Sequence, residues 1–126
     1  MRVSTGWLLA LVLAIGLAGC VSDSRPGASA CAASNVELEL RLTADSLQPA
    51  PAVCRDQEVT LRIASEVDGF LHIHGYDHAV SATDVVAGET LDLIFVADRA
   101  GQYPIELHPA DDPEGKSIGV LTVHEP

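Results

Sequence analysis

Sulfur and positive charge are both scarce in this chain of 126 residues. It contains one methionine, Met1, and three cysteines, so it offers few of the soft ligands that Cu(I) prefers. Only 7 residues are Lys or Arg, against 18 that are Asp or Glu, and the formal net charge is −11. A chain this acidic is a poor partner for nucleic acid or for a bare anionic lipid surface. Its charge serves either solubility or the attraction of cations.

Long apolar runs are confined to one segment near the N-terminus. The residues from Trp7 to Leu17 follow Arg2 and are too few to span a bilayer, but they suit the apolar region of a signal peptide. The segment ends in Leu17-Ala18-Gly19-Cys20, the lipobox pattern of bacterial lipoproteins, in which the cysteine is acylated. We predict that residues 1–19 are removed and that the acyl chains on Cys20 anchor the chain in a lipid bilayer. An ordinary secretory signal with a chance cysteine is the alternative.

Two segments follow the predicted signal peptide. Residues 20–34 are rich in Ser, Ala and Gly and predict a flexible, lipidated stalk, whereas residues 35–126 are enough for one folded domain. We therefore expect a protein held on the periplasmic side of a bacterial membrane, outside the cytoplasm. Val21 follows the acylated cysteine, and the absence of Asp there favours the outer membrane in a cell with two membranes.

Cys31 and Cys54 remain once Cys20 is assigned to lipid. An even pair of cysteines in an oxidising compartment favours a disulfide bond between them. Such a bond closes a loop of about two dozen residues and adds about 3 kcal/mol of stability in the chain-entropy model. A metal site with two thiolates is the alternative, although the pair lacks the close Cys-x-x-Cys spacing of such sites.

Short alternating segments dominate the rest of the chain. Apolar residues alternate with polar ones over residues 36–42 and 58–63, which is the pattern of strands with one buried face. Further strands are expected over residues 91–96, 103–107 and 118–123, with turn signals rich in Gly, Pro and Asp between them. No helical period of useful length occurs. These features predict an all-β fold, a small antiparallel sandwich or Greek-key barrel of about seven strands.

The order of these pieces resembles the cupredoxin domain over about residues 35 to 126, and most of all the versions in cytochrome oxidase subunit two and nitrous oxide reductase. The segments that carry the resemblance are Phe70-Leu71-His72-Ile73-His74-Gly75-Tyr76, Ala87-Gly88, Phe95-Val96-Ala97-Asp98, Gly101-Gln102-Tyr103, His108 and Gly119-Val120-Leu121-Thr122-Val123. The resemblance implies that His74 matches the first copper-ligand histidine of the family. It also places the family's copper cysteine on Leu107 and its methionine on Ser117, so both sulfur ligands are missing. Blue type 1 copper and electron transfer depend on the Cu–thiolate bond, and we do not expect them here.

Three histidines remain as candidate metal ligands: His72, His74 and His108. On a strand, His72 and His74 share one face about 6.5–7 Å apart, which one ion can bridge. In a cupredoxin-like sandwich we expect the ends of the strands that carry His74 and His108 to meet at one pole. A core histidine that only satisfies its hydrogen bonds is the alternative for His72.

Several other residues near these histidines receive an expected role. His78 and Glu106 are candidates for a fourth ligand, whereas His124 is expected far from the pole on the last strand. Asp77 and Asp84 are expected to bond their own backbone in turns, and Tyr76 and Tyr103 to lie in the core. Three acidic residues in the loop after His108 are expected to raise the local cation concentration: Asp111, Asp112 and Glu114.

These observations lead to a functional hypothesis. We predict a membrane-anchored, cupredoxin-like lipoprotein that is not an enzyme and that binds a non-blue divalent metal, Cu(II) or Zn(II), through histidines. It would handle the metal or deliver it to a receiving extracytoplasmic protein. The alternative is a metal-free interaction or structural domain of the same fold. A zinc hydrolase is a third reading, which needs a general base and a pocket.

Overall fold

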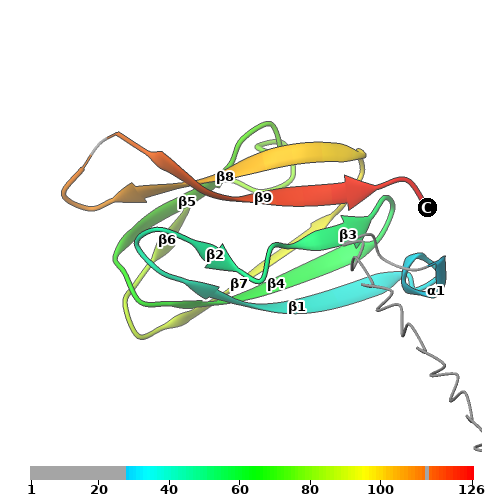
Figure 1. The fold of residues 1–126 in the computed structure, drawn as a ribbon, viewed down its shortest axis with the longest axis horizontal. Coiled ribbons are helices and arrows are strands. Elements are labelled where there is room, and N and C mark those ends of the chain that lie inside the picture. Colours follow the sequence, from blue (N-terminus) through cyan, green and yellow to red (C-terminus); the bar gives the residue numbers. More distant parts are fainter. Residues whose placement is uncertain (1–27, 113) are drawn as a thin grey trace, which may run out of the picture.

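The computed structural model describes residues 28–112 and 114–126, and within these ranges the fold is almost entirely β-structure (Figure 1). The predicted signal peptide, Cys20 and most of the predicted stalk lie outside the described residues. No helix in the described ranges has the length and apolar character that crossing a bilayer requires. A short helix and nine strands follow one another in the order α1 (Ala28–Cys31), β1 (Asn35–Leu42), β2 (Leu47–Gln48), β3 (Ala52–Cys54), β4 (Glu58–Ser65), β5 (Gly69–Ile73), β6 (Thr83–Val85), β7 (Thr90–Val96), β8 (Gly101–Pro109) and β9 (Lys116–His124).

The strands form two sheets that pack face to face, which confirms the predicted all-β sandwich. One sheet has the order β2-β1-β4-β7 and the other has the order β3-β9-β8-β5-β6. Alternate side chains of each strand point between the sheets, because successive side chains of a strand face opposite ways. The fully buried residues at the centre of this core include Leu42, Leu61, Ile63, Ile73, Tyr76, Ile105, Leu107 and Leu121.

The number and direction of the strands differ from the prediction in two respects. The described residues form nine strands rather than about seven, because β2, β3 and β6 have only two or three residues, too few to show an alternation. The sheets are also not wholly antiparallel, since β1 pairs with β4 and β3 pairs with β9 in parallel. After the hairpin of β1 and β2 the chain crosses to the other sheet as β3. It then returns on the opposite side of β1, so β4 runs in the same direction as β1.

A disulfide bond joins Cys31 to Cys54 at one end of the sandwich, in agreement with the pairing expected from the sequence. The buried amide of Gln57 strengthens this connection. Its Nε2 donates hydrogen bonds to the carbonyl oxygens of Ala30 and Ala33, both at 2.9 Å, and its Oε1 accepts one from the Cys54 N–H at 2.7 Å. The segment that precedes β1 is therefore joined to β3 by the disulfide bond and to Gln57 by two hydrogen bonds, while Gln57 is itself hydrogen-bonded to β3.

Candidate metal site on the outer face of the five-stranded sheet

The antiparallel pairing of β5 with β8 brings two distant polar segments together. In the register of this pair, His72 lies opposite Glu106 and Phe70 lies opposite His108. The neighbouring residues Leu71 and Leu107 are buried in the core. Because side chains alternate along a strand, His72, Glu106 and His108 therefore share the outer face of the sheet.

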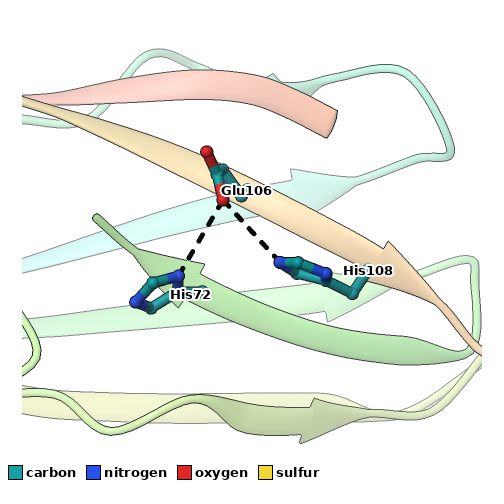
Figure 2. Close-up of side chains that lie close together, drawn as sticks. All are labelled: His72, Glu106 and His108. Atoms are coloured by element: carbon teal, nitrogen blue, oxygen red, sulfur yellow. Dashed lines mark ion pairs between the residues drawn. The ribbon is translucent and has the colours of Figure 1, made fainter. Parts of the chain in front are cut away.

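The side chains of His72, Glu106 and His108 converge on one point of this face (Figure 2). The Glu106 Oε2 atom lies 3.9 Å from His72 Nδ1 and 3.7 Å from His108 Nε2. One donor atom from each residue lies within 4.8 Å of both others. The side chains of His72, His108 and Glu106 are 23%, 20% and 31% exposed, so the cluster is partly sheltered but still open to solvent. Two imidazoles and a carboxylate in this arrangement are a donor set for a divalent metal ion.

A second carboxylate, from Asp77, contacts the other nitrogen of the His72 ring. The Asp77 Oδ1 atom is hydrogen-bonded to His72 Nε2. This hydrogen bond is the main reason that the pKa of Asp77 lies below its ordinary value. The backbone of Asp77 itself and that of Gly75 also lower this pKa through hydrogen bonds, as predicted for a turn residue, whereas the contact with His72 was not predicted. The turn at Gly75, which has φ +85°, brings the chain back toward β5.

The ring of His108 is held between two neighbours. One face stacks on the ring of Phe70, with a centroid distance of 4.5 Å and an interplanar angle of 3°. On another side, the backbone of Gly115 comes so close that a Cβ atom built on Gly115 would lie 2.3 Å from His108 Cε1 and 2.4 Å from His108 Nε2. Any side chain at residue 115 would thus displace the imidazole, so the glycine leaves the space that the ring occupies.

The backbone opposite Glu106 is irregular. On the side of β8 that faces β9, Ile105 pairs with Gly119 whereas Glu106 pairs with Ser117, so the register shifts by one residue at this point. Such bulges bend a strand locally and re-aim the side chains beside them, and they are frequent near functional sites. Ile118, which the bulge leaves without a partner in the ladder, is buried in the core. The bulge therefore lies directly beside the carboxylate that joins the two histidines.

The structure places the three predicted histidines on one face but not at one pole. Because β5 and β8 are antiparallel neighbours, their C-terminal ends lie at opposite ends of the pair, and the expectation that these ends meet is wrong. His74 follows the end of β5, where its N–H donates a 2.8 Å hydrogen bond to the Pro104 carbonyl. Its ring packs edge-on against that of His72 with a centroid distance of 5.6 Å, and His74 is not a member of the converging group.

The other two histidines lie outside the group. His78 was a candidate for a fourth ligand, but its Nε2 is 2.9 Å from a carboxylate oxygen of Asp98 and its Nδ1 accepts a 2.8 Å hydrogen bond from Arg99. The hydrogen bond from His78 is the main cause that lowers the pKa of Asp98. His124 pairs with Cys54 at the opposite end of β9 from Ser117, so it lies far from the cluster, as expected from the sequence. Glu106, the other candidate fourth ligand, is instead the residue that connects His72 with His108.

Acidic side chains gather beside the site. A hollow of about 560 Å³ adjoins Phe70 on the side away from His72, and four of its lining residues are aspartates. They are Asp68, Asp84, Asp111 and Asp112, and the last two are residues that the sequence analysis expected to raise the local cation concentration. These groups are part of the net charge of −11 of the whole chain, and their negative potential favours the approach of a cation.

The two positions that match the sulfur ligands of a blue copper protein carry no sulfur and do not belong to this cluster. Leu107 is buried between the sheets with 1% exposure, on the face opposite to Glu106 and His108. Ser117 lies exposed on β9, opposite Glu106. Within the described residues the two cysteines are bonded to each other, and no methionine is present. The donors available at the outer face are therefore nitrogen and oxygen atoms.

Solved structures with a similar architecture are known, although no match was found at the level of sequence. No protein-family model and no curated protein matches the sequence. Among solved structures, a multicopper oxidase from Pseudomonas thermotolerans superposes with a TM-score of 0.52 and 21% identity, over 72% of this chain and 30% of that one. A blue copper oxidase from Nitrosomonas europaea gives a TM-score of 0.46 and 15% identity over 71% of this chain and 43% of its own. A copper-containing nitrite reductase from Thermus scotoductus gives a TM-score of 0.42 and 22% identity over 72% of this chain and 27% of its own. This chain thus spans less than half the length of each of these proteins, and its likeness to the first of them, over 72% of this chain, shows a cupredoxin-like fold.

Proposed function

We propose that this protein is a membrane-anchored, extracytoplasmic metal-binding module, and that His72, Glu106 and His108 hold a divalent ion on the outer face of its five-stranded sheet. The observation that carries the proposal is the convergence of one donor atom from each of these side chains within 4.8 Å. In the site of a bound Zn²⁺ or Cu²⁺, nitrogen and oxygen donors lie about 2.0–2.2 Å from the metal. Donors of a tetrahedral site are then about 3.4 Å apart.

The site needs a small rearrangement to reach that geometry. The two distances from the Glu106 oxygen, 3.7 and 3.9 Å, exceed the tetrahedral separation by about half an ångström or less, and the nitrogens of the two histidines, within 4.8 Å of each other, exceed it by about 1.4 Å at most. Rotation of the side chains alone can supply such a shift. The His108 ring is already oriented by Phe70 and Gly115, and the His72 ring is already in contact with Asp77. Both rings are therefore largely ordered before the ion binds, so binding loses less side-chain conformational entropy.

The chemistry of the donors supports Cu(II) or Zn(II) and a site that is not blue. A blue copper site needs a thiolate, and the cysteines in the described residues are bonded to each other. Imidazole and carboxylate donors suit both Cu(II) and Zn(II), and the general order of affinities favours Cu(II) at equal availability. Three protein donors leave at least one coordination position open toward solvent. An ion held in this way is accessible to a second protein, which supports metal handling or delivery as the role.

We propose a binding module rather than an enzyme. The oxidase that superposes on this fold is a much longer chain, of which the present one covers 30%, so nothing of its activity transfers. The anchor rests on Leu17-Ala18-Gly19-Cys20, which lies outside the described residues. The acylated Cys20 would hold the protein on the periplasmic side of a bacterial membrane, with the outer membrane favoured by Val21. Replacement of Cys20 by Ser should move the protein from the membrane fraction to the soluble fraction.

Metal titration of the purified protein, without a polyhistidine tag, tests the proposal. We expect one Cu(II) or Zn(II) per chain by elemental analysis and calorimetry, and a Cu(II) absorption that lacks the intense band of a thiolate complex. The variants His108→Ala and Glu106→Gln should lower the affinity at least tenfold with little change in melting temperature, since both residues are partly exposed. His124→Ala is the matched control and should bind as the natural chain does. A natural chain that stays metal-free after loading would refute the site and leave the metal-free interaction domain.

A further inference from the structure

The ring of His72 lies between two carboxylates, and each of them faces a different ring nitrogen. Asp77 is hydrogen-bonded to Nε2, whereas Glu106 lies 3.9 Å from Nδ1 on the side of His108. The sequence gives no sign of this arrangement, because Asp77 comes from the segment after β5 and Glu106 from β8. Each ring nitrogen of His72 therefore faces a different carboxylate.

A neutral imidazole carries one N–H and one lone pair, and its neighbours decide which nitrogen has which. An ionised carboxylate only accepts hydrogen bonds, so the contact with Asp77 requires the proton on Nε2. The lone pair then lies on Nδ1, the atom that faces Glu106 and His108. In metal sites the ligand histidine commonly donates its other N–H to a carboxylate, which fixes the tautomer and the orientation of the ring.

The segment that carries Asp77 is itself held in place. The Tyr76 N–H donates a 2.9 Å hydrogen bond to the Ile73 carbonyl and closes the turn after β5. The Tyr76 side chain is completely buried, and its ring packs edge-on against Phe95 and Tyr103 with centroid distances of 5.6 and 4.5 Å. An adjacent residue therefore anchors Asp77 to the core, so its carboxylate returns to the same place beside β5.

We propose that Asp77 is a positioning residue that holds His72 in the Nε2–H tautomer and so makes Nδ1 the metal-binding atom. This inference rests on the proposed function only for its consequence in metal affinity, since the tautomer exists in the metal-free protein. A surface ion pair alone would contribute little, because the Asp77 side chain is 61% exposed. The contribution of Asp77 is instead directional, since it selects one of two nitrogens.

Nitrogen NMR of the metal-free, 15N-labelled protein at about pH 8, where an ordinary histidine is neutral, gives a direct test. Long-range correlation spectra distinguish the two tautomers of each ring. We expect His72 of the natural chain to show the Nε2–H form alone. In Asp77→Asn the amide can donate to Nε2, so the Nδ1–H form should appear and the affinity for Zn(II) should fall about 10- to 100-fold.

Asp98→Asn is the matched control, because Asp98 holds His78 in the same way outside the metal site. It should alter the spectrum of His78 and leave both the His72 spectrum and the affinity for Zn(II) unchanged. Asp77→Glu, which keeps a carboxylate, should retain the Nε2–H form. A natural chain with the Nδ1–H form at His72, or an Asp77→Asn variant that keeps the Nε2–H form, overturns the inference. If the tautomer is as expected but Zn(II) does not bind, the proposed function fails and the role of Asp77 in fixing the ring stands.

Discussion

Replacement of Gly115 by Ala should abolish the preformed position of His108 and leave the fold almost unchanged. The added Cβ would lie 2.3 to 2.7 Å from three atoms of the His108 ring, whereas non-bonded carbon atoms pack at about 3.5–4.0 Å. The ring must therefore retreat by more than about 1 Å. Retreat toward Phe70 is closed, because the two rings already stack with a centroid distance of 4.5 Å. The ring must leave its present position, so its 3.7 Å separation from Glu106 must change and the preformed geometry is lost.

The expected effect of Gly115→Ala on metal binding is the loss of one of the three ligands. We expect the affinity for Cu(II) or Zn(II) to fall at least tenfold, which corresponds to about 1.4 kcal/mol. Residue 115 is exposed and its backbone is not in the left-handed region, so alanine adds no strain of its own. The melting temperature of the metal-free protein should therefore change little. Calorimetric titration and thermal unfolding of the same samples separate the two effects.

Gly88→Ala is the opposite control. Gly88 has φ +84° and nothing lies within 4 Å of a Cβ built on it, so alanine there meets no neighbour but adopts a strained backbone. Such strain costs about 1–2 kcal/mol. We expect Gly88→Ala to lower the melting temperature while its metal affinity matches that of the natural chain. If Gly115→Ala binds the ion as tightly as the natural chain does, the position of the His108 ring does not determine the site and the reasoning is refuted.

Two further predictions concern regions outside the metal site. Replacement of Cys31 and Cys54 by Ser removes a bond that spans 23 residues, and should destabilise the protein by about 3 kcal/mol without a change in metal affinity; equal melting curves would contradict this. The hydrogen bond with His78 is the main cause that lowers the pKa of Asp98 from its ordinary value. Asp98 therefore stabilises the fold above about pH 4, and this contribution is lost as the pH falls through the lowered pKa. The melting temperatures of the natural chain and Asp98→Asn should therefore differ above pH 4 and converge in more acidic solution, whereas a constant difference would exclude this linkage.

The strands that the sequence predicted well are those with a long alternation. The segments over 36–42 and 58–63 have one apolar face each, and they correspond to β1 and β4. The two-residue strand β2 and the three-residue strands β3 and β6 are held by pairing with their neighbours, which no local pattern reveals. The parallel pairing of β1 with β4 likewise depends on a crossover between sheets and has no local sequence signal.

The candidate site could be predicted only in part from the sequence, for a related reason. Alternation alone placed His72 on the face of His74, and Glu106 on the face of His108. It could not show that Glu106 lies opposite His72, because register between distant strands depends on the packing of the whole sheet. The contact of Asp77 with His72 depends in addition on the buried Tyr76, so a turn residue became a partner of the site.

The disulfide between Cys31 and Cys54 determines how the domain would face its surroundings. Cys54 pairs with His124, the last residue of β9, whereas Glu106 pairs with Ser117 near the beginning of β9, and Figure 1 shows that β9 runs along the sandwich from one end toward the other. The proposed lipid anchor would therefore be attached at the end of the sandwich remote from His72 and His108. These two histidines would then lie away from the attachment point, where a docking protein could reach a bound ion without displacing the anchor.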